Sequence, residues 1–208
     1  NACQLRSNSN PFLHAQRALL VALRDWVVDG TAPPESLYSS IGRGSLVKQS
    51  EIKIPYVPAS NFTVPGVTNQ KVYLDRGRRF DVEDASGIMA EPPIYGATYN
   101  VLIPQVDADG NPIDGLRNTN VQVPLGTYTG WNTRKAGFSE GDSCDLTGGF
   151  IPFFKTKAER EAAGDPRLSL EERYPTHADY VDKVTAAADD LVSKRLLLQE
   201  DANNIIAA

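Results

Sequence analysis

A wide apolar stripe near the start of the chain sets the strongest limit on its fold. Asn10 suits a helix cap, Pro11 the first helical position and Gly30 a left-handed stop, so residues 11–29 are predicted to form a helix. Its apolar side chains recur at helical spacing: Leu13, Leu19, Leu20, Leu23, Trp26 and Val27. A stripe this wide must pack against a large surface. Because the chain shows no long parallel sheet, we expect the covering sheet to come from outside it.

The composition is that of a globular protein. The chain has 208 residues, of which 41% are hydrophobic and 23% charged, enough for one sizeable core or pieces of two. The net charge of −5 and the lack of a basic patch argue against nucleic acid as a partner. No apolar run approaches the roughly 20 residues that span a bilayer. The start, NACQLRSNSN, lacks an initiator Met and a signal-peptide apolar core, so a fragment or a trimmed chain is expected.

The middle of the chain is rich in turns and short strands. The best strand candidates are residues 99–106 and 120–125, joined by a polar link with Asp-Gly at its centre. Weaker candidates are an edge strand within residues 50–57 and a short strand around residues 71–74. The spacing of Asp107, Asp109 and Asn111 invites a calcium loop. However, Pro112 stands where such a loop needs Gly and Asn118 where it needs Glu, so no metal is expected.

The last quarter of the chain is predicted to be helical. Two helix starts fit a capping box, in which Thr156 and Ser169 each precede a glutamate by three positions. A third helix is predicted to begin at Thr176, where Asp179 gives an acidic first turn that suits the helix dipole. The helix after Thr176 has an apolar face that includes Val184, Ala188 and Leu191. Residues 196–206 are expected to pack back on it as a last helical turn.

Two cysteines, Cys3 and Cys144, lie in polar loops. Their setting, without helical or CxxC spacing, favours a disulfide over a metal site. Two alternatives stay open. Both residues can be free buried thiols, as in a cytosolic protein, or Cys3 can pair with a cysteine outside this chain.

No complete catalytic site is visible in the sequence. A serine hydrolase of the Ser–His–Asp type needs its nucleophile on a G-x-S-x-G turn, and Gly42-Arg43-Gly44-Ser45 has the wrong order. His14 and His177 each fall in the first turn of a predicted helix, where a surface role is the usual one. No phosphate-binding glycine loop is present, and we expect no cofactor.

An ordered set of motifs nevertheless resembles a known family. The segments are NPFLHAQRALLVALRDWVVDGTAPPES, VLIPQVDADGN, VPLGTYTGWN, CDLTGGFIPF, GDPRLSLEERY and HADYVDKVTAAADDLVSKRLLLQEDA. Together they resemble the C-terminal region of a bacterial family of large α/β-hydrolase-domain proteins, over about residues 10–202. The resemblance implies an α/β fold in three parts: the last helix of the hydrolase core (1–30), a β-rich extension with a hairpin (31–155) and a helical C-terminal segment (156–208).

The resemblance also carries expectations about function. In this family the catalytic histidine lies shortly before the helix that corresponds to residues 11–29, in a Gly-Thr-x-His segment that this chain lacks. The resemblance therefore implies no catalytic residue here, and partners in the form of an upstream hydrolase core and a small-molecule ester substrate. It further implies a secreted or periplasmic protein. The alternative function is a non-catalytic binding or interaction module.

One loop offers candidate substrate contacts. Tyr128, Trp131 and Asn132 supply aromatic and amide groups of the kind that line clefts. The competing interpretation is that Tyr128 and Trp131 belong to a core or an interface, since Trp is usually largely buried.

Overall fold

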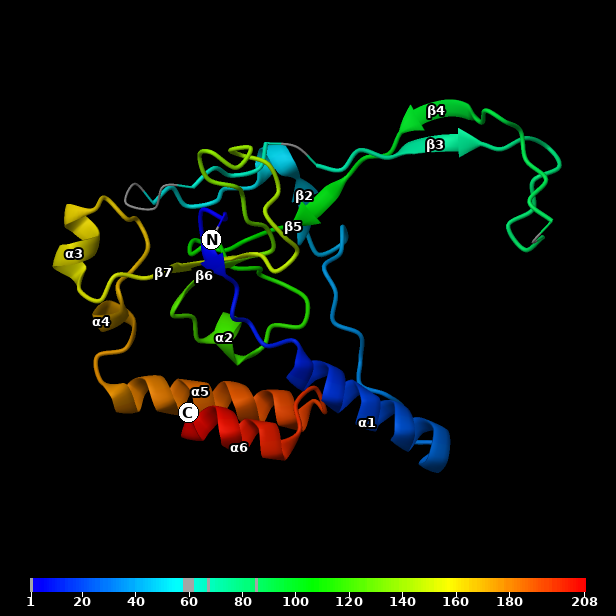
Figure 1. Cartoon of the computed structure of the whole chain (residues 1–208). Coiled ribbons are helices and arrows are strands. Elements are labelled where there is room, and N and C mark those ends of the chain that lie inside the picture. Colours follow the sequence, from blue (N-terminus) through cyan, green and yellow to red (C-terminus); the bar gives the residue numbers. More distant parts are fainter. Residues whose placement is uncertain (1, 58–61, 67, 85) are drawn as a thin grey trace.

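The computed structural model describes residues 2–57, 62–66, 68–84 and 86–208, with small sheets above a layer of helices (Figure 1). The strands are β1 (Arg6–Ser7), β2 (Leu46–Lys48), β3 (Val72–Asp75), β4 (Ile94–Thr98), β5 (Leu102–Pro104), β6 (Gly126–Thr129) and β7 (Gly149–Pro152). The helices are α1 (Leu13–Asp29), the 3-10 turn η1 (Gln49–Glu51), α2 (Thr119–Gln122), α3 (Lys157–Ala162), α4 (Leu170–Arg173), α5 (His177–Ser193) and α6 (Gln199–Ala207). The architecture is mixed α and β, as predicted.

A three-stranded antiparallel sheet in the order β1-β7-β6 lies at the centre of the molecule. All four residues of β6 are buried, and β6 pairs along its whole length with β7. The two strands approach so closely at Gly126 that a Cβ atom there would lie 2.4 Å from the Ile151 carbonyl oxygen. Glycine is therefore required at this position by the pairing itself.

The segment before α1 is tied firmly to this sheet. Cys3 and Cys144 form a disulfide with their Cα atoms 5.5 Å apart, which confirms the predicted pairing. Beside it, the backbone N–H of Gln4 donates to the Thr133 carbonyl at 2.8 Å. Two residues further on, β1 pairs Arg6 with Phe150. These links fix the path of the chain into α1 although they join residues more than a hundred positions apart.

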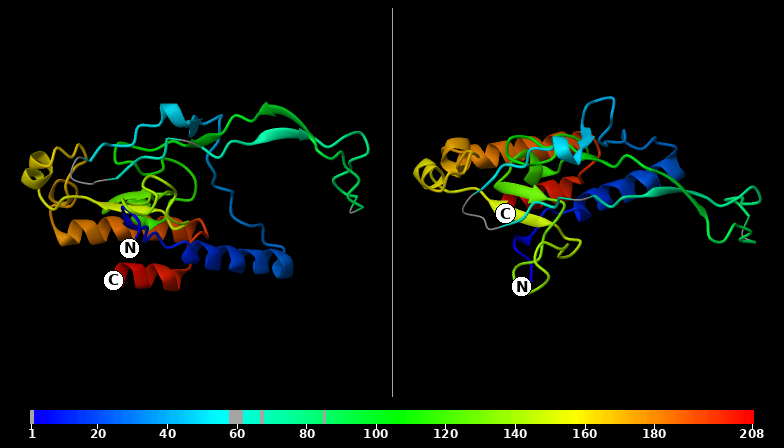
Figure 2. Two further views of the ribbon diagram at one scale, coloured as in Figure 1. Left: turned by 45° about the horizontal axis from the view of Figure 1, so that its top comes forward. Right: turned by 90° about the horizontal axis from the view of Figure 1, so that it is seen from above.

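Helices α5 and α6 form an antiparallel pair beneath the sheet (Figures 1 and 2). Their shared core contains five buried residues: Ala188, Leu191, Leu196, Leu197 and Ala202. Val123, just before β6, packs with Val184 of α5 and so joins the helical layer to the β layer. None of the helices in the described part of the chain is both long and apolar enough to cross a membrane.

The two capping boxes predicted at Thr156 and Ser169 are confirmed, and Thr176 forms a third box that the sequence analysis does not predict. The side chains of Thr156, Ser169 and Thr176 each accept a hydrogen bond from the backbone N–H three residues on. In return, Glu159, Glu172 and Asp179 accept from the backbone N–H of the capping residues. Both ends of each box are satisfied, which fixes where α3, α4 and α5 begin.

A two-stranded ribbon projects from the sheets on one side (Figures 1 and 2). It consists of β3 paired with β4, and all five residues of β4 are exposed. The predicted strand around residues 71–74 is thus present, whereas the sequence analysis does not predict β4. Gly96 within β4 lies against Tyr73, where a Cβ atom would come within 2.9 Å of the ring.

Three predicted strands need correction. Residues 99–106 contain only the short strand β5, which pairs with β2. Residues 120–125 do not form a strand: α2 occupies their first part, because the Asn118 side chain caps it by accepting from the Val121 N–H. The expected edge strand within residues 50–57 is replaced by η1 at its start, and residues 52–57 lie in no named strand.

The start of the first helix also differs from the prediction. α1 begins at Leu13, and its cap position is held by Phe12 without a side-chain hydrogen bond. Asn10 instead donates its backbone N–H to the Asn8 side chain, in a turn that precedes the helix. The predicted stop is confirmed, since Gly30 adopts φ 70° and its N–H reaches back to the Trp26 carbonyl.

Candidate functional site

The outer face of α1 is apolar and uncovered. Leu20, Trp26 and Val27 are 68%, 53% and 76% exposed. The helix turns its small residues Ala18 and Ala22 towards its own chain, where they are almost completely buried. The rest of the exposed apolar side chains on or beside α1 are Phe12, Leu13, Leu19, Leu23 and Val28. We call these eight side chains the α1 face; so many large exposed apolar side chains on one helix are typical of an interaction site.

Polar contacts hold α1 against the rest of the chain along its inner edge. Arg17 forms ion pairs with Glu200 and with the buried Asp201 of α6. At the other end of the helix, the Arg195 guanidinium nitrogen Nη2 lies 3.8 Å from the Asp25 carboxylate oxygen Oδ2. The helix is therefore anchored in one orientation, and that orientation leaves the α1 face open to solvent.

Asn132, a predicted substrate contact, is used inside the structure. Its side-chain oxygen accepts from the backbone N–H groups of Leu5 and Thr133, at 3.1 and 3.0 Å. Its side-chain nitrogen donates to the carbonyls of Leu5 and Gly148, at 3.1 and 3.3 Å. Asn132 is 1% exposed, and its side chain joins the N-terminal segment to the β6–β7 sheet by hydrogen bonds. Both polar atoms of its amide already have partners within the protein.

The two aromatic candidates make packing contacts, with Tyr128 buried and Trp131 partly buried. Trp131 packs beside the buried cluster of Leu5, Val57 and Ile151, with its ring 5.9 Å from that of Phe62. Tyr128 is 6% exposed and lies 5.0 Å from the Phe150 ring. Burial raises the pKa of the Tyr128 phenol to about 12. The structure thus places both rings in packing positions, and a direct role in substrate contact stays a prediction.

The described residues do not assemble a catalytic triad. Among them no hydrogen bond joins His14 or His177 to a serine or a carboxylate, although such bonds define the arrangement. Ser45 is buried, and its hydroxyl donates to Asp114 at 2.5 Å. That bond, together with hydrogen bonds from the Gly115 backbone N–H and from Arg43, lowers the pKa of Asp114 to about 2. The contacts of Arg43 and Ser45 with Asp114 join two loops of the chain.

The described residues also form no metal centre. In this part of the chain, no group of three or more His, Cys, Asp or Glu side chains converges. The Asp107 carboxylate, considered for calcium, accepts from the backbone N–H groups of Asp109 and Asn111, each at 2.9 Å. It therefore organises its own turn, as Asp commonly does.

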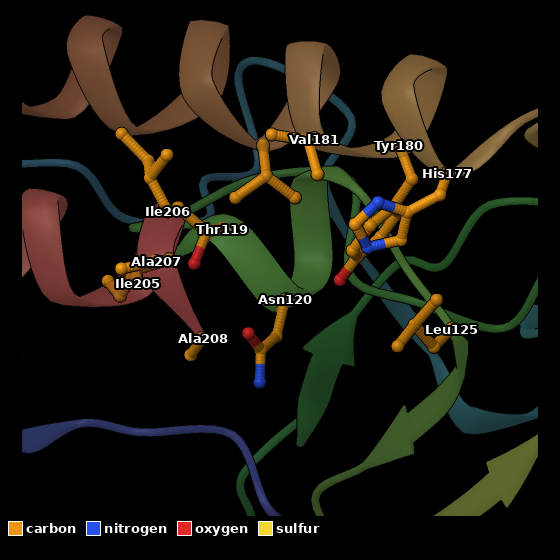
Figure 3. A pocket seen from close by; sticks show the side chains of 11 residues that line it. Thr119, Asn120, Leu125, His177, Tyr180, Val181, Ile205, Ile206, Ala207 and Ala208 are labelled. Atoms are coloured by element: carbon orange, nitrogen blue, oxygen red, sulfur yellow. The ribbon is translucent and has the colours of Figure 1, made fainter.

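A cavity of about 450 Å³ opens between α2, α5 and α6 (Figure 3). Its polar side chains are Thr119 and Asn120 of α2 and His177 and Tyr180 of α5. Thr119 is 3% exposed, and its hydroxyl has no hydrogen-bond partner within the described residues. Burial raises the pKa of Tyr180, whose ring meets Tyr174 edge-on at 5.0 Å.

The sequence does not predict this cavity. It places His177 on the surface of its helix, and this residue is indeed exposed at the first position of α5. The sequence analysis assigns no role to Thr119 and predicts that Asn120 lies in a strand. The available signal is Asn118, a residue type that caps helices; in the short helix that follows it, Thr119 and Asn120 both line the cavity (Figure 3).

Comparison with known proteins adds one finding. The family model described as "Alpha/beta hydrolase domain" matches residues 1–207, nearly the whole chain. No curated protein and no solved structure gave a match.

Proposed function

We propose a function that starts from the family: the chain belongs to the alpha/beta hydrolase domain family. In this proposal it is the C-terminal part of a serine-type hydrolase that acts on an ester-like bond. The described residues hold no Ser–His–acid constellation, so the catalytic groups come from another segment or chain. In this proposal the present chain closes one side of the hydrolase core. The observation that carries it is the α1 face, which needs a partner surface of matching size.

The proposed chemistry is acyl transfer to a serine. A serine oxygen attacks the acyl carbon, a histidine takes the serine proton, and backbone N–H groups hold the developing oxyanion. The histidine gives this proton to the alcohol, which leaves as the acyl-enzyme forms. The histidine then takes a proton from the attacking water and gives it to the serine oxygen as the acid leaves. The role of this chain is to shield the core sheet from water and hold its last helix in place.

An export compartment fits the same proposal. The disulfide between Cys3 and Cys144 would persist in an oxidising environment, such as the periplasm or the exterior of the cell. We therefore propose a secreted or periplasmic enzyme. Peptide mapping without reductant, on protein isolated from its natural host, tests this: free thiols at Cys3 and Cys144 would contradict it.

The activity itself is tested with p-nitrophenyl esters and a fluorophosphonate label. We expect the complete protein to hydrolyse the esters and to be labelled at a serine outside residues 1–208. The 208-residue chain alone should show neither turnover nor labelling. Turnover by the chain alone that disappears in His14→Ala or His177→Ala would overturn the assignment of the catalytic groups to another segment.

The α1 face also favours a second candidate, a non-catalytic interaction module that docks on a separate protein through the same apolar surface. The two candidates differ in what covers the α1 face. Crosslinking in the native material, followed by mass spectrometry, distinguishes them. Crosslinks from Arg24 or its neighbours to a segment that contains G-x-S-x-G favour the hydrolase, and crosslinks to an unrelated chain favour the module.

A further inference from the structure

We propose that the β3–β4 ribbon is a second docking element, and that the hydrolase core that covers the α1 face also encloses this ribbon on both of its faces. The inference rests on the proposed function for the identity of the partner, and it adds a contact region in a different part of the chain. Three features carry it: the uncovered faces of the ribbon, its position relative to α1 and the extent of the family match.

The ribbon is a regular structure that its own chain leaves uncovered. Its hydrogen bonds begin at the base, where the Tyr99 N–H donates to the Lys71 carbonyl at 2.8 Å. They continue to the Ala90 N–H, which donates to the Arg76 carbonyl at 2.7 Å. The extended strand from residue 71 to residue 76 therefore spans roughly 20 Å. Since a two-stranded ribbon is at best marginally stable in water by itself, this one needs packing that the described residues do not supply.

Both faces of the ribbon carry large apolar side chains. Leu74 pairs with Tyr95, and Asp75 pairs with Ile94. Neighbouring residues of a strand point to opposite faces, so Tyr95 and Ile94 lie on opposite faces of the ribbon. Their exposed fractions are 70% and 66%. A partner that rests on one face leaves the other apolar face in water, so the ribbon fits a partner that encloses it.

The exposed apolar side chains continue into the loop between β3 and β4. They are Phe80, Val82, Ile88 and Met89. The charges of this loop are nearly balanced, because its three arginines face four acidic residues in the sequence: Arg76, Arg78, Arg79, Asp81, Glu83, Asp84 and Glu91. A surface without a dominant sign does not select nucleic acid or a charged membrane surface. Apolar contact is therefore the basis on which the ribbon recognises its partner.

The position of the ribbon links it to the α1 face. In all three views the ribbon and α1 extend from the same side of the molecule (Figures 1 and 2). Both elements carry large exposed apolar side chains, whereas α5 and α6 bury theirs against each other. A single partner on that side can therefore contact both elements.

The family match favours the hydrolase core as that partner. The match runs over residues 1–207, so it includes the ribbon as part of an alpha/beta hydrolase domain. A domain of the α/β class is built on a mostly parallel sheet with helices on its faces. The described residues form only small antiparallel sheets. The segment that supplies the parallel sheet is thus the natural cover for a ribbon of the same domain.

The competing occupant is a second copy of this chain. In a twofold dimer the same surface of both copies forms the contact, so ribbon packed on ribbon covers one face of each. Such a dimer leaves either Ile94 or Tyr95 exposed in both copies. The two faces of the ribbon therefore distinguish the two partners.

The test places the photoreactive residue p-benzoylphenylalanine at one position at a time in the complete protein. Positions 94 and 95 sample the two faces of the ribbon, and position 20 samples the α1 face. Position 146 is the control, because Leu146 is fully exposed in the loop between β6 and β7. We expect positions 94 and 95 both to crosslink, within one polypeptide, to the segment that carries the serine labelled by fluorophosphonate. Position 146 should give no such crosslink.

The outcomes separate this inference from the proposed function. If position 20 crosslinks to the serine-bearing segment but positions 94 and 95 do not, the proposed function stands and the role of the ribbon is wrong. Crosslinks from the ribbon to a second copy, or from one face of the ribbon only, also overturn the inference. Crosslinks from all three positions to an unrelated chain overturn both.

Substitutions in the complete protein give an independent measurement. Ile94→Ser and Tyr95→Ser each remove an apolar side chain that the core would bury, so each should lower the melting temperature by a few degrees. Leu146→Ser is the matched control, and we expect no shift because this side chain is fully exposed. An unchanged melting temperature in either ribbon variant would show that its face stays in water, and this would overturn the inference.

Discussion

Helices α1 and α5 have the same length, 17 residues, and both are amphipathic, yet only α5 is covered. α5 buries Val184, Ala187, Ala188 and Leu191, whereas α1 buries only two alanines and exposes its large side chains. The comparison shows that an apolar stripe specifies that a surface will be covered but does not specify which segment covers it.

The difference arises in the segment after each helix. After α5 the chain turns at Arg195, with φ 59°, and brings Leu196 and Leu197 into the core before α6 runs back along α5. After α1, Gly30 ends the helix and Pro33-Pro34 prevents a helical return. The chain then passes upwards to β2 (Figure 1), so no neighbouring segment in the described part of the chain lies over the α1 face.

The largest expected effect on stability comes from removing the Cys3–Cys144 disulfide, which holds the segment before α1. In the chain-entropy description, a disulfide that closes a loop of 141 positions contributes about 4–5 kcal/mol to the free energy of unfolding. The double variant Cys3→Ser, Cys144→Ser should lose most of this, as measured by urea denaturation. Equal unfolding midpoints of the parent protein with and without reductant would contradict a stabilising disulfide.

A matched pair of substitutions tests the two helices directly. Leu191→Ala in α5 should cost about 2–5 kcal/mol, because it leaves a cavity in a packed core. Leu20→Ala in α1 should change the stability of the chain alone by no more than about 0.5 kcal/mol, since this side chain is exposed. Similar costs for both, in denaturation of the 208-residue chain, would remove the contrast.

A smaller effect is expected at the inner edge of α1. Arg17→Ala should destabilise the chain by about 1–3 kcal/mol, because it leaves the buried Asp201 carboxylate without its cation. Adding Asp201→Asn should recover part of this loss by removing the charge. If the double variant is less stable than Arg17→Ala, the ion pair is not what holds α1 on α6.

The last effect, which is absent at neutral pH, is a dependence of stability on alkaline pH near α5. Burial raises the pKa values of Tyr128 and Tyr174 to about 12, above the usual 10. Their contribution to stability is complete below about pH 10 and is lost as the pH rises towards about 12. Near-ultraviolet absorbance should show these two phenols ionising after the exposed ones, and Tyr128→Phe should remove one late step. Simultaneous titration of all the tyrosines would contradict this.

Sequence reasoning performs best where local chemistry decides the structure. The capping boxes at Thr156 and Ser169 and the Gly30 stop follow from residue types at fixed positions, and all are present. The disulfide, favoured by the loop setting of its two cysteines, is present too. It fails where tertiary contacts decide. Residues 120–125 are predicted to form a strand, but the Asn118 cap starts a short helix there. β4 escapes prediction because Gly96 weakens its strand pattern, although the close approach of Tyr73 explains that glycine.

The candidate site is harder to predict than the fold. Asn132 looks like a cleft residue in the sequence, since nothing local reveals that its side chain joins β6 and β7 to Leu5, more than a hundred residues away. The cavity near Thr119 likewise depends on the packing of three helices. The wide stripe on α1, in contrast, is correctly predicted to be a surface without a covering partner in the described part of the chain.

The most direct test of the central claim compares the two tryptophans by hydroxyl-radical footprinting. In the 208-residue chain, Trp26 is 53% exposed and should oxidise much faster than the partly buried Trp131. In the complete protein we expect Trp26 to become protected, because a hydrolase core covers the α1 face, while Trp131 changes little. If Trp26 oxidises equally fast in both samples, the α1 face is not an interface and the account is wrong.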